Sequence, residues 1–246
     1  MTKKDIEIGF WRFNDGFWEE PLRIEDTEIY STERLVVEVS TFNQEVRNLS
    51  ASKKRELRRV WAETLPKLDN VKYLMTTHQI DQDFFEAICE MKNLEGLYIK
   101  WGKVDSIDNI TKLINLKHLY FGSNPRIKSI EGISKLENLK TLELENFKDC
   151  EDFFKIERLK NLESLKIMPS VNGALIKLKD LEFMRELTEL KVLELGIILI
   201  DKRIEPIYKL KNLVRLWIPD HLYKKYDKRE LKKNFKNLKY GNLIRN

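Results

Sequence analysis

Few residues of this chain have the types and spacing that catalysis needs. The three histidines, His78, His118 and His221, lie far apart, so they predict no shared metal or acid–base site. Cys89 and Cys150 also lack metal-ligand spacing, and we expect both to be buried free thiols. No phosphate-cradling glycine loop and no short catalytic motif occurs. The sequence therefore predicts a non-enzymatic protein with no metal and no cofactor.

Glu143 and Glu145 are the one close pair of carboxylates whose geometry invites an acid–base interpretation. They stand two residues apart, and this spacing places both on one face of a strand. Paired carboxylates can act as general acid and base. On an open strand face, however, we interpret them as charges that serve an interaction.

The elements that position these residues repeat along the chain. The segment L-x-N-L-x-x-L-x-[L/I/F] returns eight times between Leu68 and Phe235, with copies that begin at residues 68, 91, 113, 136, 159, 187, 210 and 235. This period and this leucine spacing are the signature of a leucine-rich repeat horseshoe. The sequence therefore predicts an α/β solenoid with a parallel sheet on its concave side.

Each repeat predicts a strand followed by an irregular return. In the strand 96–100, Leu97 and Ile99 alternate with outward residues, so these two face the core. On the return, apolar residues recur every three positions, as in Ile107, Ile110 and Leu113. A period of three suits 3₁₀ turns better than an α-helix.

The repeats resemble the short repeats, about 22 residues long, of internalin-type and phosphatase-regulator proteins. The resemblance covers residues 68–243 and implies a fold that binds other proteins. It also implies an asparagine three residues after the last strand leucine, but among the copies that begin at residues 91 to 210 only Asn124 occupies that place. The other repeats carry Gly102, Phe147, Ser170, Ile198 and His221 there. A second set of asparagines, at 93, 115, 138, 161, 212 and 237, is expected to shape the bend into each strand.

The chain divides into three parts. Residues 1–67 are predicted to form an N-terminal cap with a hairpin within 6–18, a strand at 34–40 and a helix from Ser52 to Pro66. The aromatic hairpin residues Phe10, Trp11, Phe13, Phe17 and Trp18 either pack in this cap or form a docking surface. Residues 68–220 are the repeats, and residues 221–246 are a basic C-terminal cap with a final degenerate repeat. One step of 28 residues adds about five residues at 169–175, either as a neutral insertion or as a loop beside the binding face.

The outward residues of the strands are the candidate binding surface. Eight strands about 4.8 Å apart give a face about 38 Å long, which suits a protein partner better than a small molecule. Tyr, Trp and Arg are enriched at binding hot spots, although exposed aromatics also simply favour sheets. The candidate partner-binding residues are Tyr73, Met75, Tyr98, Lys100, His118, Tyr120, Glu143, Glu145, Lys166, Met168, Glu194, Arg215 and Trp217.

Charge and hydropathy indicate which other partners and which compartment the chain could have. Residues 221–246 hold nine Lys or Arg against two Asp or Glu, so an alternative function is binding of nucleic acid or an acidic partner there; the other interpretation is a solvated cap helix. The chain has no run of 18 apolar residues, and no apolar run of signal-peptide length follows its first lysines, so we expect neither a membrane span nor a signal peptide. We therefore expect a cytoplasmic monomer without membrane contact that binds another protein. A narrower hypothesis is an immunity or inhibitor protein, because the acidic middle of the face suits a basic partner.

Overall fold

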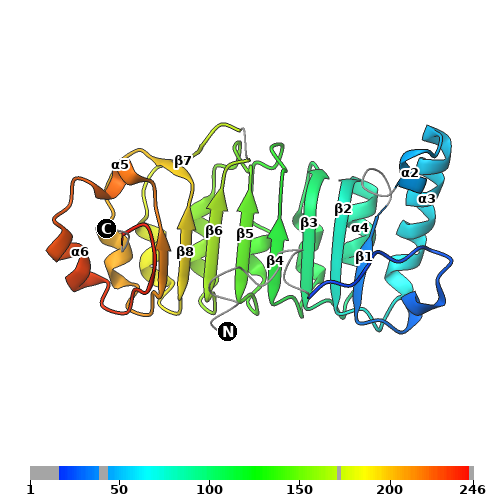
Figure 1. The fold of residues 1–246 in the computed structure, drawn as a ribbon, viewed down its shortest axis with the longest axis horizontal. Helices are drawn as coiled ribbons and strands as arrows, with labels where there is room; N and C mark the ends of the chain where they lie inside the picture. Colours follow the sequence, from blue (N-terminus) through cyan, green and yellow to red (C-terminus); the bar gives the residue numbers. More distant parts are fainter. Residues whose placement is uncertain (1–16, 39–43, 171–172, 244–246) are drawn as a thin grey trace.

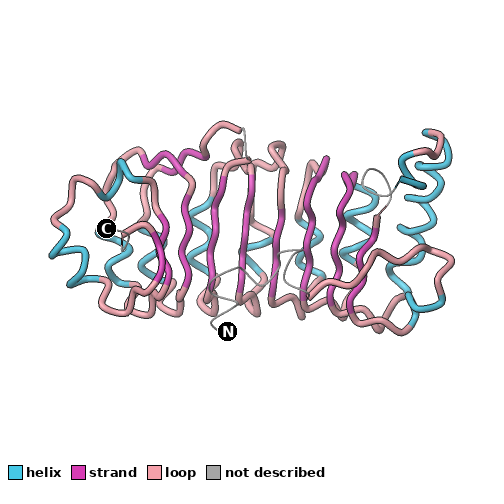
Figure 2. The backbone as a smooth tube through the Cα atoms, in the orientation of Figure 1, coloured by secondary structure: helices cyan, strands magenta, loops and turns pink. Residues whose placement is uncertain are grey.

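The computed structural model describes residues 17–38, 44–170 and 173–243, and it confirms the leucine-rich repeat solenoid. A single layer of parallel strands forms one face, and short helical segments lie behind it (Figures 1 and 2). Nine strands pair in the order β1-β2-β3-β4-β5-β6-β8-β10-β11. They span Arg34–Val37 (β1), Tyr73–Asp81 (β2), Gly96–Lys103 (β3), His118–Phe121 (β4), Thr141–Glu145 (β5), Ser164–Met168 (β6), Val192–Leu195 (β8), Arg215–Trp217 (β10) and Tyr240–Gly241 (β11).

The convex returns are 3₁₀ helices, as the period of three predicts. Ile110 N–H donates to the Ile107 carbonyl at 3.1 Å, and Leu113 N–H donates to that of Ile110 at 3.0 Å. The 3₁₀ segments are Asp108–Lys112 (η4), Ile133–Lys135 (η5), Phe153–Arg158 (η6), Glu182–Glu186 (η7) and Glu205–Lys209 (η8). The first full repeat differs, because its return is the α-helix Gln82–Cys89 (α4), which the Asp81 side chain caps by accepting from Phe84 N–H.

The core is a stack of leucines between the sheet and these helical segments. Leu97, Leu119, Leu142 and Leu165 stand in register on neighbouring strands, and all are buried. Because one repeat cannot bury its leucines alone, each depends on the repeat before and after it. The two predicted free thiols, Cys89 and Cys150, are also buried.

The N-terminal part continues the sheet. β1 pairs in parallel with β2, Arg34 opposite Tyr73, and is shorter than the strand predicted for 34–40. The predicted helix is α3, Ala51–Thr64, so its start at Ser52 was one residue late. The cap is Ser50, whose hydroxyl accepts from Lys53 N–H at 3.3 Å. The other segments here are η2 (Thr27–Tyr30), α2 (Gln44–Arg47) and η3 (Leu65–Lys67). The predicted hairpin lies outside the described residues except for Phe17 and Trp18.

The second set of asparagines does more than shape a bend. The Asn115 side chain donates to the carbonyl of Lys92 at 3.0 Å, and Asn138 donates to that of Ile114 at 2.9 Å. In each case the acceptor is the residue just before the corresponding asparagine of the preceding repeat, Lys92 before Asn93 and Ile114 before Asn115. The same bond recurs at Asn93, Asn161, Asn212 and Asn237. These amides therefore connect consecutive repeats by satisfying carbonyls at the bend.

Among the described residues the turn asparagine occurs once, at Asn124, and other residues replace it in the neighbouring repeats. The Asn124 side chain is buried, and its oxygen accepts from Val104 N–H at 3.3 Å. A side chain at position 102 would overlap it, because a Cβ there would lie 2.4 Å from the Asn124 amide nitrogen. Phe147 fills its turn with a buried ring packed edge-on against Phe121, with centroids 5.6 Å apart. The turns thus pack by different means in different repeats.

The longer repeat carries a second, two-stranded sheet. β7 (Ile176–Leu178) pairs in parallel with β9 (Ile197–Leu199), beyond the ends of the main strands near the top of Figure 1. The chain ends with α5 (Asp220–Tyr223) and α6 (Lys228–Asn234) before β11. Buried Leu222, Leu231 and Phe235 hold this end against the last repeat.

Candidate functional site

An aromatic cluster covers the N-terminal third of the concave face. Trp18, Val36, Met75 and Tyr120 form an apolar cluster separate from the leucine core, with Phe17, Tyr73 and Tyr98 packed against it. The Trp18 ring lies edge-on to Tyr98 with centroids 6.4 Å apart, and Phe17 lies edge-on to Tyr73 at 5.1 Å. Residues 17 and 18 of the same chain therefore cover part of the surface that the sequence predicted to bind a partner.

Tyr98 and Tyr120 are stacked, with ring centroids 4.2 Å apart and planes 7° from parallel. The Tyr120 hydroxyl donates to the Glu145 carboxylate and accepts from Lys100 Nζ at 3.0 Å. Burial, followed by the negative charges near it, raises the pKa of Tyr120 above its ordinary value. Tyr120 is only 5% exposed and Met75 only 1%. These two outward side chains are therefore buried in a second core, which the aromatic cluster forms on this face.

A row of alternating charges crosses the middle of the face. Lys166 is buried between Glu143 and Glu194, with its ammonium nitrogen 3.7 Å from an oxygen of each. Arg215 pairs with the same Glu194 from the next strand, and Lys100 pairs with Glu145 at 3.0 Å. The acidic middle of the face is thus neutralised by cations of its own chain. Outward side chains on adjacent parallel strands pair with one another, so these carboxylates do not form an uncompensated acidic surface.

The remaining predicted residues lie at the margins of these two groups. His118 Nδ1 lies 3.0 Å from the hydroxyl of Thr141 on the next strand. Met168 ends β6 opposite Glu145. Trp217 on β10 lies opposite Glu194 and is 38% exposed, an unusually open position for an indole. The open aromatic side chain therefore lies at the C-terminal end of the face, next to Arg215 and the charged row.

Sequence reasoning missed that Phe17 and Trp18 pack on the concave side. The Arg34 guanidinium donates to the Phe17 carbonyl at 3.2 Å and lies 4.6 Å from the centre of its ring. Neither contact has a periodic signal in the sequence, because residues 17 and 34 belong to no repeat. The run of aromatic residues before the first strand was the available indication, but it does not say which face they cover.

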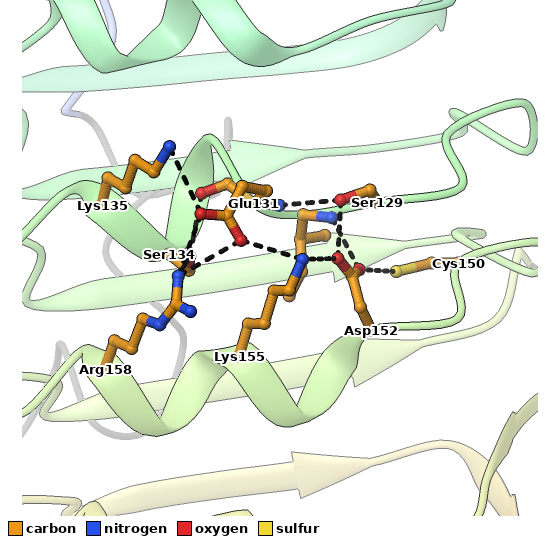
Figure 3. A network of polar contacts seen from close by, with 9 residues as sticks. Ser129, Glu131, Ser134, Lys135, Cys150, Asp152, Lys155 and Arg158 are labelled. Atoms are coloured by element: carbon orange, nitrogen blue, oxygen red, sulfur yellow. Dashed lines mark hydrogen bonds and ion pairs between the residues drawn. The ribbon is translucent and has the colours of Figure 1, made fainter.

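A cluster of ionisable residues on the convex side is the other candidate site (Figure 3). Buried Asp152 accepts from the Ser129 hydroxyl at 2.6 Å, from Ile130 N–H at 2.8 Å and from Lys155 at 2.7 Å. Burial alone would raise the pKa of Asp152, but these hydrogen bonds outweigh it and lower the pKa.

The second carboxylate of this cluster is also fully paired. Glu131 pairs with Lys155 at 2.8 Å, with Lys135 at 3.3 Å and with Arg158 at 3.0 Å, and the contacts to Lys155 and Lys135 first of all lower its pKa to about 2. Every charged group in Figure 3 has a partner within the cluster, so it serves to join adjacent repeats. Within the described ranges no group of His, Cys, Asp and Glu could hold a metal ion.

The basic C-terminal segment places its charges outward. Lys224 pairs with Asp220 at 3.0 Å, and the Lys225 ammonium lies 5.0 Å from the centre of the Tyr226 ring. Lys232 and Lys233 on α6 are exposed and make no ion pair among the described residues. The geometry is that of a solvated cap whose apolar side faces the last repeat. None of the helices in the described part of the chain is long and apolar enough to cross a membrane.

Comparison with known proteins agrees with this architecture. A family model described as "Leucine Rich repeats (2 copies)" matches residues 114–155, which lie within the solenoid described above. None of the curated proteins compared with the chain matches it significantly.

Several solved structures are similar to the chain. A structure titled as a TDR receptor is 19% identical with a TM-score of 0.51, over 73% of this chain and 32% of that one. Internalin C2 from Listeria monocytogenes is 16% identical with a TM-score of 0.41, over 73% of this chain and 90% of that one. The Arabidopsis receptor kinase HAESA, solved with the peptide hormone IDA and the co-receptor SERK1, is 16% identical with a TM-score of 0.49, over 74% of this chain and 31% of that one. At these identities the first similarity indicates the fold alone.

Proposed function

We propose that this chain is a non-enzymatic scaffold that binds another protein on the C-terminal half of its concave face. Leucine-rich repeat proteins generally serve as protein-binding scaffolds, which supports the general role. The observation that carries the location is Trp217, a large aromatic side chain that stays open while the N-terminal aromatics are covered by Phe17 and Trp18. We propose that the protein acts in the cytoplasm as a monomer.

The surroundings of Trp217 have the composition of a binding hot spot. Arg215 and Glu194 lie beside it on the same face, and Lys166 continues the row on β6. An aromatic anchor surrounded by paired charges provides apolar area to bury and polar groups that fix orientation. The charges are mutually satisfied, so a partner gains little from charge alone and more from covering the indole.

The narrower hypothesis, an immunity or inhibitor protein, now has less support. It depended on an uncompensated acidic surface, and Lys100, Lys166 and Arg215 compensate that surface. Nucleic-acid binding through the basic C-terminal segment is the rival function. It predicts binding that weakens steeply with salt and depends on Lys232 and Lys233.

The test compares capture of partners by wild type and two variants, with Lys232→Gln/Lys233→Gln as a third variant for the rival function. Wild type, Trp217→Ala and the control Ile114→Ala are immobilised and exposed to host extract, and the captured protein is identified and purified. Ile114 is an exposed aliphatic residue in the bend before β4, away from the concave face, so it controls for loss of apolar surface. We expect Trp217→Ala to weaken binding by about 2 kcal/mol, roughly 30-fold, and Ile114→Ala to leave it unchanged. Equal affinity of all three forms would move the site off this face. Loss only in Lys232→Gln/Lys233→Gln would favour the basic segment.

A further inference from the structure

Beyond the ends of the main strands, one pair of neighbouring repeats in the described part of the chain lies without a backbone hydrogen bond between its turns. Where the main strands end, backbone hydrogen bonds join some of the successive turns. Glu151 N–H donates to the Lys128 carbonyl at 3.0 Å, and Asp201 N–H donates to that of Lys179 at 3.1 Å. Among the described residues no such bond joins Glu151 to Lys179, although they occupy matching positions two residues before Phe153 and Leu181. The break coincides with the repeat that is about five residues longer than its neighbours.

The break leaves one edge of the small sheet open. Ile200 N–H donates to the Leu178 carbonyl at 2.9 Å, so the backbone N–H and C=O of Leu178 point toward β9. Peptide groups alternate in direction along a strand, and those of Lys177 therefore point to the opposite edge. No backbone hydrogen bond of Lys177 on that edge occurs among the described residues. An unpaired strand edge is a ready template for a further strand.

A groove lies along this open edge. It has a volume of about 890 Å³, and its walls include Lys148 and Cys150 from the turn before η6 and Lys177 and Lys179 from β7 and the turn after it. The groove thus lies between the turn that contains Glu151 and the strand β7, which among the described residues are not joined by a backbone hydrogen bond. The size is that of a cleft that accepts several residues of an extended chain.

The groove combines exposed apolar side chains with free cations. Phe154 and Ile200 line it and are 55% and 62% exposed. Lys128, Lys148, Lys177 and Lys179 also line it, all four are exposed, and none makes an ion pair among the described residues.

The lysines of this groove differ from others on the convex surface. Lys112, Lys155 and Lys160 each pair with a carboxylate within 2.8 Å. The acidic residues of the groove are Asp149, Glu151 and Asp180, and Asp180 is engaged in accepting from Glu182 N–H at 3.0 Å. Four lysines without an ion pair among the described residues therefore line the groove with three carboxylates, a small excess of positive charge next to two open apolar side chains.

We propose that this groove binds an extended segment of a partner protein that carries acidic side chains beside an apolar one. The segment lies along the free edge of β7 and exchanges hydrogen bonds with the peptide groups of Lys177. Its carboxylates pair with Lys148, Lys177 and Lys179, and its apolar side chain covers Phe154 and Ile200. This surface is separate from the concave face, so the proposal stands or falls independently of the function proposed above.

A fluorescein-labelled peptide, Asp-Glu-Phe-Glu-Val-Glu-Ser, tests the proposal by fluorescence anisotropy with the full chain. The control peptide replaces each acidic residue by its amide. Lys177→Gln/Lys179→Gln removes two groove charges, and Lys232→Gln/Lys233→Gln removes two exposed charges from α6 as the matched control. We expect the groove pair to weaken binding at least about tenfold and the α6 pair to change it less than about twofold. Trp217→Ala is expected to leave peptide binding unchanged.

Hydrogen exchange then locates the bound peptide. We expect slower exchange at the amide of Lys177, because a strand added at this edge accepts from it. Ile200→Ser is expected to weaken binding several-fold without altering the circular dichroism spectrum, since this side chain is mostly exposed. The proposal is overturned if the acidic peptide does not bind, if both lysine pairs weaken it equally, or if protection appears only on α6 or the concave face.

Discussion

The side-chain amide of Asn161 donates to the main-chain carbonyl of Glu137, 24 residues earlier, at 2.9 Å. This bond ties the bend before β6 to the bend before β5. The same bond joins the bends before β4 and β3 through Asn115 and Lys92. Position 189 interrupts the series, because Glu189 stands where the other repeats carry asparagine, and a carboxylate cannot donate to the carbonyl of Lys160.

Glu189→Asn is therefore expected to stabilise the protein. The register between β6 and β8 is regular, with Ser164 opposite Val192, so an amide at 189 would stand over the Lys160 carbonyl as Asn161 stands over that of Glu137. One added hydrogen bond contributes about 0.5–1.5 kcal/mol, which for a chain of this size raises Tm by roughly 2–4 °C. Asn161→Ala should lower Tm by a similar amount. A melt of Glu189→Asn that matches Glu189→Gln would show that the amide does not reach this carbonyl.

Substitutions of Leu142 test the stacking of leucines in the core. It is buried on β5 between Leu119 and Leu165, and Leu142→Ala is expected to cost roughly 2–5 kcal/mol because the cavity cannot be filled by either neighbour. Leu142→Asp is expected to prevent folding, since it places an unpaired charge in the same stack. Denaturant melts measure the first and circular dichroism the second. Ile114→Ala, an aliphatic truncation at an exposed site, should change stability by less than about 0.5 kcal/mol.

Periodicity accounts for what the sequence could predict. Leu97, Leu119 and Leu142 recur with their neighbours at a fixed step, so the strands, their register and their buried face follow from spacing alone. Phe17 and Trp18 have no such spacing, and their position over Tyr73 and Tyr98 depends on contacts between segments far apart in the sequence.

The ion pairs of the candidate site could not be predicted from the sequence either. The repeat register places Glu143, Lys166 and Glu194 side by side on neighbouring strands. It does not show that the Lys166 ammonium lies between the two carboxylates and that its side chain is buried. Likewise the longer step at 169–175 indicates an insertion, while the break between Glu151 and Lys179 follows only from the hydrogen bonds of the folded chain.

Glu131 gives a prediction for pH dependence. Its pKa falls from an ordinary value of 4.5 to about 2 in the folded protein, chiefly through hydrogen bonds from Lys155 and Lys135. A carboxylate with a depressed folded pKa stabilises the fold above its unfolded pKa, and this contribution is lost as pH falls toward the folded pKa. The Tm of Glu131→Gln is therefore expected to lie below that of wild type at pH 7, and the difference should shrink between pH of about 4.5 and about 2. Glu189→Gln, an exposed position without an ion pair among the described residues, is the control and should show no such trend.

Cys150 is expected to resist alkylation in the folded protein. Burial raises the pKa of its thiol to about 12, so little reactive thiolate exists at pH 8. Cys89 is buried as well, and burial raises the pKa of its thiol in the same direction. Labelling of both thiols should therefore follow unfolding, with full reaction only in denaturant. Lys232→Cys places a thiol on exposed α6 and should react at once. Fast labelling of Cys150 under native conditions would show that the turn before η6 opens locally.

The contact between Trp18 and Tyr98 is expected to stabilise the fold as well as cover the concave face. Trp18 is nearly buried, its ring meets Tyr98 edge-on, and Tyr98 in turn stacks on Tyr120. A double-mutant cycle with Trp18→Ala and Tyr98→Ala should give a coupling energy of about 0.5–1.5 kcal/mol in denaturant melts, because edge-to-face aromatic pairs contribute this much beyond the area they bury.

The matched cycle pairs Trp18→Ala with Trp217→Ala at the far end of the same face, separated from β3 by several strands. These two changes should be additive within about 0.5 kcal/mol, since they share no partner. If the first cycle shows no coupling, residues 17 and 18 do not hold this position in solution. Tyr73, Tyr98 and Tyr120 would then be open to a partner, and the binding surface would extend over the whole concave face instead of its C-terminal half.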